Sequence, residues 1–184
     1  MSIIARAKEL LAMKPVFLDT ETTGLGPLDQ IVELAIVDTD GSVLLDTLVK
    51  PTIRIPSVAE AIHGISNDDI AGAPSFAAVL PELQKAIGSR PLVIYNADYD
   101  LRLIRQSAKA HRLTANLARN AHCAMKMYAE FRGVWDDFRR EYRWHKLDVA
   151  AIQCGIDLDH QAHRARSDAD LARRVTMTIA GIAC

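Results

Sequence analysis

The sequence contains only three cysteines, Cys123, Cys154 and Cys184. Their odd number, wide separation and lack of CxxC spacing argue against a disulfide framework and against a zinc site. A chain with this cysteine usage is typical of a reducing compartment, and we expect a cytoplasmic location.

Long apolar runs are also absent, and the net charge is close to zero. No apolar run approaches the roughly 20 residues of a membrane span, and the amphipathic first segment, SIIARAKELLAMK, lacks a signal-peptide core. We therefore expect a soluble protein without membrane contact. The formal net charge is −1 and the sequence pI is about 6.6. Such a chain has no general attraction for polyanions, so any nucleic acid must be held by a local basic surface and by bound metal.

The hydrophobic content is sufficient for a substantial core. A length of 184 residues with 49% hydrophobic residues favours one domain over residues 1–184. Two strands joined at Asp40 and Gly41 form a predicted hairpin. The order of elements indicates an α/β fold with a mixed sheet. Strands are predicted at 15–20, 31–50, 91–96 and 120–125, and helices at 3–13, 57–71 as short turns, 75–87, 98–111, 146–154 and 167–179.

The segment LDTETTGLG places Asp19 and Glu21 where an apolar run ends. Side chains two positions apart on a strand share a face, so both carboxylates can point at one cation while Leu18 and Thr20 point the other way. An isolated DxE is more often only a polar strand end. The TTGLG that follows adds Thr22, whose hydroxyl and amide suit a phosphate or sugar, and glycines that permit close backbone approach.

The segment HRARSDADLARRV carries His163 and Asp168. Five helical residues rotate by about 140° at roughly 3.6 residues per turn, so the histidine should precede the helix. Ser167 is the predicted N-cap, with Asp170 three residues later. Asp168 then lies in the first turn, where the helix dipole favours its ionised form. His163 suits proton removal from water, although a solvated histidine among arginines is an equal alternative.

The segment VIYNADYDLRLI offers two aspartates for one role. Asn96 or Asp98 is suited to cap the helix that carries Asp100, so either aspartate is equally a structural residue.

Carboxylates that converge without Lys or Arg partners are costly to ionise, and their hard oxygens suit Mg²⁺ or Mn²⁺. The residues thus predict a two-metal phosphodiester hydrolase and leave the choice between Asp98 and Asp100 open.

Taken in order, the segments LDTETTGL, HGIS, YNADYDLRLI and HRARSDADL resemble the motifs of the DEDDh exonucleases. This family includes polymerase proofreading subunits, ribonuclease T and oligoribonuclease. The resemblance spans residues 15–175, and the pattern His-x-Ala-x-x-Asp is similar to the histidine subclass. It implies a ribonuclease-H-like α/β fold, with a five-stranded mixed sheet, helices on both faces, and a first strand that carries Asp19 and Glu21 at its centre.

The family's Asn-Ala-x-Tyr/Phe-Asp pattern implies Asp100 as the ligand in place of Asp98. The resemblance further implies two divalent ions, Mg²⁺ or Mn²⁺, roughly 3.5 to 4 Å apart, with a histidine as general base. The implied catalytic residues are Asp19, Glu21, Asp100, His163 and Asp168, of which the four carboxylates would hold the metals.

Contacts to the terminal nucleotide are implied as well. Leu25 and Ile65 would pack on or wedge beside the last base, and His63 would reach toward the sugar or phosphate. Asn96 and Tyr99 would flank the same pocket. Each has a structural alternative, because Leu25 and Ile65 are equally core residues and Asn96 and Tyr99 equally cap or pack the following helix.

Residues 130–146, EFRGVWDDFRREYRWHK, depart from the shorter family members. Basic and aromatic residues that alternate suit a single strand, because rings stack on bases and cations follow phosphates. The same segment reads as an ordinary amphipathic helix with aromatics packed inward, which is the interpretation we favour. The residues in question are Trp135, Phe138, Tyr142 and Trp144 with Arg139, Arg140, Arg143 and Lys146.

Three functions are compatible with these patterns. The first is a 3′–5′ exonuclease that releases nucleoside monophosphates from single-stranded or frayed DNA ends, alone or with a polymerase or repair partner. The second is an exoribonuclease for short or structured RNA, since the residues do not decide the sugar. The third, a non-cleaving module that binds nucleic acid or a partner, is disfavoured by the complete catalytic set. The sequence does not indicate an oligomeric state.

Overall fold

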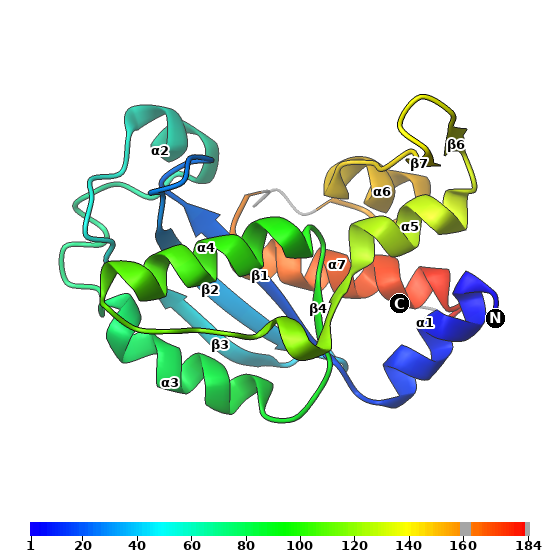
Figure 1. The fold of residues 1–184 in the computed structure, drawn as a ribbon, viewed down its shortest axis with the longest axis horizontal. Helices are drawn as coiled ribbons and strands as arrows, with labels where there is room; N and C mark the ends of the chain where they lie inside the picture. Colours follow the sequence, from blue (N-terminus) through cyan, green and yellow to red (C-terminus); the bar gives the residue numbers. More distant parts are fainter. Residues whose placement is uncertain (159–162, 183–184) are drawn as a thin grey trace.

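A computed structural model of the chain describes residues 1–158 and 163–182. Its centre is a five-stranded sheet in the order β3-β2-β1-β4-β5 (Figure 1). The central strand β1 pairs antiparallel with β2 and parallel with β4, so the sheet is mixed, as predicted. The strands are β1 (Val16–Thr22), β2 (Ile31–Asp38), β3 (Val43–Leu48), β4 (Leu92–Ile94) and β5 (Ala121–Cys123).

Helices cover both faces of this sheet, which confirms the expected arrangement (Figure 1). Val16 and Leu18 of β1 pack in a core cluster with α3 and α4, whereas Phe17 packs in a second cluster with α7. Because side chains alternate along a strand, the α7 face continues from Phe17 to Asp19 and Glu21. The helices are α1 (Ile3–Ala12), α2 (Ser57–His63), α3 (Phe76–Ile87), α4 (Ala97–Ala110), α5 (Ala124–Arg132), α6 (Leu147–Gln153) and α7 (Ala165–Ile179).

The β2–β3 connection is the predicted hairpin. Gly41 adopts φ +90°, a conformation that favours glycine, and its N–H donates to the carbonyl of Asp38 at 2.9 Å. The connection from α4 to β5 runs along the outside and ends in a short 3₁₀ turn, Ala118–Asn120.

The amphipathic helix favoured for residues 130–146 is wrong. Helix α5 ends at Arg132, because Gly133 takes a left-handed conformation and its N–H donates to the carbonyl of Ala129 at 3.1 Å. The chain then forms a two-stranded hairpin, β6 (Trp135–Asp136) with β7 (Glu141–Tyr142), before α6. The aromatic residues of this segment do not pack inward, and Phe138 is 96% exposed.

The predicted start of the last helix also needs correction. Helix α7 begins at Ala165 with Arg164 in the N-cap position, so Ser167 lies inside the first turn and caps nothing. Asp168 is nevertheless in the first turn, as expected. The helix starts earlier than predicted because a carboxylate from β2, distant in the sequence, caps it in place of Ser167.

Neither Cys123 nor Cys154 is part of a disulfide bond within the described residues, and Cys184 lies outside them. In the portion of the chain that the structure describes, no helix has the length and apolar character needed to cross a membrane.

Candidate active site

Three carboxylates meet at the end of the central strand. Asp19 and Glu21 share one face of β1, and Asp168 approaches them from the first turn of α7. One side-chain oxygen from each lies within 4.8 Å of the others. A strand end and a helix start thus bring together residues that are far apart in the sequence.

Asp100 completes the acidic group from the other side. It lies in the first turn of α4, and its Oδ1 accepts a hydrogen bond from the Thr20 hydroxyl at 2.8 Å. It lines the same open hollow of about 190 Å³ as Asp19, Glu21 and Asp168. Asp98 by contrast points away and forms an exposed ion pair with Lys126 at 2.6 Å, while Asn96 occupies the helix N-cap position without a side-chain capping bond.

The acidic group is costly to ionise without a cation. Burial is the first cause and repulsion between neighbouring carboxylates the second. Together they raise the pKa of Asp19 well above its usual range and the pKa of Glu21 to about 8. Burial raises the pKa of Asp100 to about 7, although the Thr20 hydroxyl acts in the opposite direction. Burial also raises the pKa of Asp168 to about 6.

This donor set fits divalent metal ions. Within the described residues none of the four carboxylates forms an ion pair with Lys or Arg. Clustered oxygen ligands next to an open hollow are the type of site that Mg²⁺ and Mn²⁺ occupy. The N-termini of α4 and α7 point toward the same place and favour ionised carboxylates there.

His163 lies at the rim of the hollow. It lines the hollow together with Asp168, is exposed, and adopts φ +67°. A positive φ is uncommon for a residue other than glycine, so the neighbouring structure must hold it. The structure therefore places a solvent-accessible imidazole beside the carboxylates.

Glu33 is the residue next to the site that sequence reasoning missed. It lies on β2 opposite Glu21 and is almost fully buried. Its carboxylate accepts hydrogen bonds from the Arg164 guanidinium and, at 2.9 Å, from the N–H of Ala165. It thereby caps α7 and holds the residue after His163. The signal was available, because a glutamate inside the apolar strand IVELAIV must be paired when buried.

Thr22 and Tyr99 are joined beside the hollow. Their hydroxyls lie 2.7 Å apart, and the Tyr99 hydroxyl also donates to the carbonyl of Gly24 at 3.0 Å. Tyr99 and Asn96 line the hollow, and Asn96 is exposed. Burial raises the pKa of Tyr99, so its hydroxyl stays protonated as a donor.

Leu25 stands on a rigid loop between β1 and β2 and is 79% exposed. Arg102 of α4 donates to the carbonyls of Leu25 and Gly26 at 3.3 and 3.1 Å. Gly24 adopts φ +156°, and a Cβ there would lie 2.8 Å from the carboxylate of Asp29, so only glycine fits. The support from Arg102 was not visible in the sequence, because this residue is 77 positions away from Leu25.

His63 and Ile65 do not line the hollow. Ile65 is 3% exposed and packs in a small core cluster that includes Val32 and Ile70. His63 is 5% exposed, its Nδ1 accepts the N–H of Ile65 at 3.0 Å, and burial lowers its pKa. The contact of these two residues with a nucleotide stays a prediction.

Sequence comparisons place these features in a known context. A family model described as "Exonuclease" (RNase_T) matches residues 16–176. The uncharacterized exonuclease CP81 of Escherichia phage 186 is 43% identical over 172 residues, which are 91% of this chain and 88% of that protein. The DNA polymerase III subunit epsilon of Treponema pallidum is 29% identical over 166 residues, which cover 88% of this chain and 74% of the subunit.

The fold is similar to that of solved exonucleases. The structure of Exonuclease X in complex with 5′-overhanging duplex DNA has a TM-score of 0.66 and 26% sequence identity. The match covers 90% of this chain and 92% of that one. The observed sheet and helices are therefore those of ribonuclease-H-like exonuclease domains.

Proposed function

The chain belongs to the DEDDh-type 3′–5′ exonuclease family, and on this premise we propose that it removes nucleoside monophosphates from DNA 3′ ends with two divalent ions and a histidine base. The observation that carries the proposal is the close group of Asp19, Glu21 and Asp168, with Asp100 in the same hollow. Uncompensated carboxylates of raised pKa have no evident structural purpose, and a metal-dependent hydrolase needs them.

The four carboxylates would hold the ions. When bound, Mg²⁺ or Mn²⁺ lowers the pKa of water and offsets the charge that develops on the scissile phosphate and the leaving 3′ oxygen. Asp19 and Glu21 contribute oxygens from a rigid strand, and Asp100 is oriented by the hydrogen bond from Thr20. Preorganised ligands of this kind avoid reorganisation during the reaction.

His163 would be the general base. Its exposed imidazole at the rim of the hollow can accept the proton that the attacking water loses. The pairing of Glu33 with Arg164 and Ala165 holds the adjoining backbone, so the imidazole is attached to a fixed helix start.

The terminal nucleotide would lie against the edge of the hollow formed by Tyr99, Asn96 and the β1–β2 loop. The exposed Leu25 would pack on the last base, and the contact of the buried Thr22 with the sugar or phosphate stays a prediction. A base that packs on a rigid apolar side chain is held without sequence preference.

DNA is the proposed substrate because Exonuclease X, which was solved with duplex DNA, shares 26% identity over most of this chain. The experiment compares 5′-labelled single-stranded DNA and RNA of the same sequence in Mg²⁺ or Mn²⁺. The expected result is a ladder that shortens from the 3′ end of DNA and stops in EDTA. Faster shortening of RNA would replace the proposal with an exoribonuclease, and binding without cleavage would replace it with a non-cleaving module.

Two variants test the assigned roles in the same assay. Asp19→Ala should abolish cleavage because it removes a metal ligand. His163→Ala should lower kcat by about 10² to 10⁴, the usual contribution of general base catalysis, with little change in KM. A His163→Ala variant with wild-type kcat would remove the histidine from the mechanism.

The similarity to a polymerase III epsilon subunit supports proofreading or repair as the process in which the activity works. An enzyme with this role should remove a mispaired 3′ nucleotide faster than a paired one, because a frayed end enters the hollow without strand separation. Equal rates on mispaired and paired duplex ends would argue against proofreading and against a polymerase partner.

A further inference from the structure

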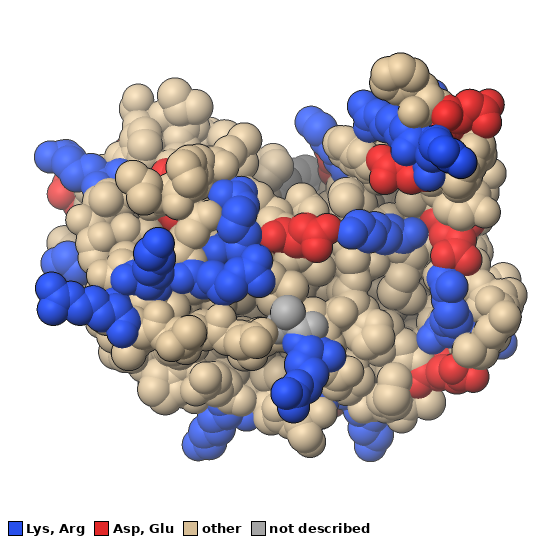
Figure 2. All heavy atoms as spheres, viewed as in Figure 1, with Lys and Arg blue, Asp and Glu red and all other residues tan. Residues whose placement is uncertain are grey.

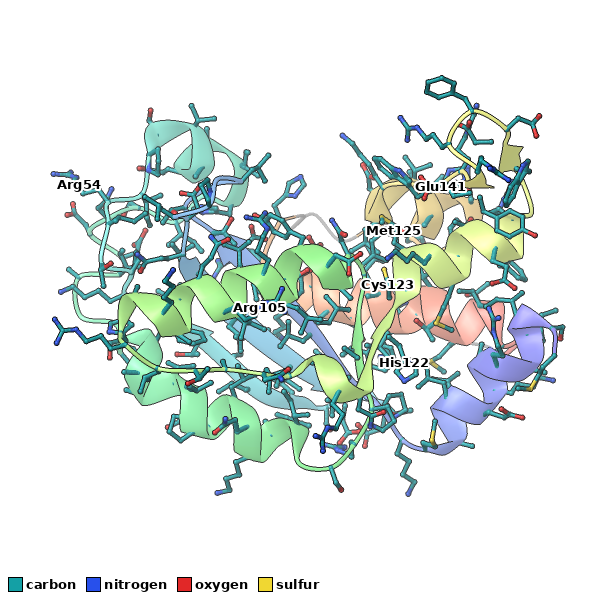
Figure 3. The ribbon with its side chains drawn as sticks, in the orientation of Figure 1. Arg54, Arg105, His122, Cys123, Met125 and Glu141 are labelled. Atoms are coloured by element: carbon teal, nitrogen blue, oxygen red, sulfur yellow. The ribbon has the colours of Figure 1, made fainter. Side chains whose placement is uncertain are left out.

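Residues 133–146 form a hairpin that stands off the body of the molecule, and we name this segment the arm (Figure 1). In Figure 1 the arm and α2 project on either side of the N-termini of α4 and α7, and Figure 2 shows a notch between them. Glu141 of the arm and Arg54 lie at opposite ends of the view in Figure 3. The arm is thus one wall of the opening that leads to the active-site end of the sheet.

The arm is held in one shape by its own hydrogen bonds. The Asp136 carboxylate accepts the N–H groups of Phe138 and Arg139, both at 3.1 Å, and the Asp136 carbonyl accepts the N–H of Arg140 at 2.8 Å. Trp135 and Tyr142 pack edge to face with ring centroids 5.2 Å apart. The tip is therefore an ordered turn that presents Phe138 to solvent.

Large aromatic side chains on the arm remain unburied. Phe138 is 96% exposed, more than any other large hydrophobic residue among those described, and Trp135 and Trp144 are 52% and 45% exposed. Isolated exposed apolar residues are ordinary, but three rings on one short hairpin are not. Exposed rings can stack on nucleotide bases, and each stacked base contributes to affinity without sequence preference.

Cations alternate with these rings. Within the described residues Arg139, Arg140 and Arg143 form no ion pair, so their guanidinium groups are available to an external anion. The arm also carries three carboxylates: Asp136 is occupied by the turn, and Asp137 and Glu141 are outnumbered by the three arginines and Lys146. Arginines beside exposed rings suit a strand whose phosphates and bases alternate, whereas they suit an apolar protein surface poorly.

The base of the arm joins the active site directly. The Tyr95 hydroxyl lies 3.0 Å from the carbonyl of His145 and 3.3 Å from that of Lys146, and Tyr95 and Leu147 both line the catalytic hollow. Lys146 lines a larger adjoining cavity, of about 630 Å³, which shares His163 with that hollow. The base of the arm is therefore contiguous with the lining of the hollow.

We propose that the arm is a second binding site for the nucleic-acid substrate, which holds an unpaired stretch of strand away from the scissile bond. Bases stack on Phe138 and Trp144, and phosphates pair with Arg139, Arg140 and Arg143. This inference rests on the proposed function, since it takes the strand to be one whose 3′ end lies in the hollow. The arm then determines affinity for long strands and contributes nothing to the chemical step.

Binding is measured first, by fluorescence anisotropy of a 5′-labelled 20-nucleotide single strand in EDTA, where no cleavage occurs. Phe138→Ala should weaken binding at least about fivefold, as expected for loss of one stacked base. The slope of log affinity against log salt is negative. The double variant Arg139→Ala with Arg140→Ala should make this slope shallower by about 1.4, for two lost phosphate contacts. The matched controls are Met13→Ala, an exposed apolar residue after α1, and Arg54→Ala with Lys85→Ala, two exposed cations away from the arm.

A second measurement separates the two proposals. The p-nitrophenyl ester of thymidine 5′-monophosphate carries a single nucleotide and lacks the further bases and phosphates that the arm would bind, so it reports on the hollow. In the arm variants, the ratio of kcat/KM for the 20-nucleotide strand to kcat/KM for the ester should fall at least about fivefold, through KM. A wild-type protein that cleaves neither substrate would overturn the proposed function. A wild-type protein that cleaves both, with the ratio and salt slope unchanged in the arm variants, would overturn only the arm proposal and indicate a protein contact instead.

Discussion

Glu33 and Arg164 are 131 residues apart in the chain and form an ion pair beside the acidic cluster. The same carboxylate caps α7 through the N–H of Ala165, so one buried side chain fixes both the helix start and the residue after His163. Because Asp168 lies in that first turn, the pair also sets where this carboxylate lies relative to β1. The arrangement assigns Glu33 a positioning role, since its carboxylate does not line the hollow.

Glu33→Gln should lower kcat about tenfold with little change in KM, because the proposed base and one proposed metal ligand lose their fixed position while the substrate contacts remain. Loss of the charge should also lower the free energy of unfolding by about 1 to 3 kcal/mol. Steady-state kinetics and urea unfolding measure the two effects. The matched control is Asp38→Asn, on the same strand, which breaks the pair with Arg90 but lies away from the site. Equal losses of kcat in both variants would contradict the positioning role.

The metal-free protein should become less stable as the pH rises. A carboxyl whose pKa is raised on folding stabilises the fold while protonated, and this contribution is lost as pH rises through the folded pKa. For Glu21 and Asp100, whose pKa values rise from 4.5 and 3.8 to about 8 and 7, the loss begins above the ordinary carboxyl value and ends near pH 8. Burial lowers the pKa of His63, which has the opposite effect near and below pH 6.5, so pH 7 to 9 is the cleaner window.

Urea unfolding in EDTA at pH 7 and pH 9 tests this expectation. The free energy of unfolding should fall by an amount on the order of 1 kcal/mol, and excess Mn²⁺ should reverse the fall because a bound cation compensates the carboxylates. Stability that is constant or rises across this window without metal would show that the carboxylates ionise freely and do not form a strained cluster.

Asp100→Asn should abolish activity and stabilise the metal-free protein. The asparagine oxygen can still accept the hydrogen bond from Thr20, but the buried negative charge is gone. Cleavage should fall at least about 10³-fold, and the free energy of unfolding at pH 8 should rise by an amount on the order of 1 kcal/mol. Asp98→Asn is the control, because Asp98 is exposed and pairs with Lys126. If Asp98→Asn had the larger effect on cleavage, the assignment of the fourth ligand would be reversed.

The sheet and the acidic cluster could be predicted because their signals are local. Asp19 and Glu21 follow an apolar run with strand alternation, and Asp100 and Asp168 begin amphipathic helices. Because β1 lies at the centre of the sheet, its carboxyl end meets the first turns of α4 and α7. Local signals did not separate Asp100 from Asp98, because both aspartates lie in the first turn of α4. The choice of Asp100 depended on the family resemblance.

The arm and the partner of Glu33 could not be predicted in the same way. Aromatic residues at helical spacing favour a helix. The segment instead forms a hairpin, because Gly133 ends the preceding helix and the Asp136 carboxylate bonds the turn, and the hydrophobic pattern predicts neither contact. Ser167 has the residue type of an N-cap, but Glu33 reaches the helix from another strand and moves its start to Ala165. In both places a specific contact outweighs local propensity.

Leu25 and Leu28 offer a matched test of the terminal-base contact. Both are 79% exposed on the β1–β2 loop, so neither Leu25→Ala nor Leu28→Ala should change the fold. The carbonyl of Leu25 is held by Arg102, whose guanidinium lies 5.2 Å from the ring centre of Tyr99, a residue that lines the hollow. If Leu25 packs on the last base, Leu25→Ala should raise KM for single-stranded DNA about fivefold, in line with loss of a buried aliphatic contact, while Leu28→Ala should not. A rise in KM of equal size in both variants would mean that the loop contributes only general apolar surface, and no rise in either would place the terminal base elsewhere.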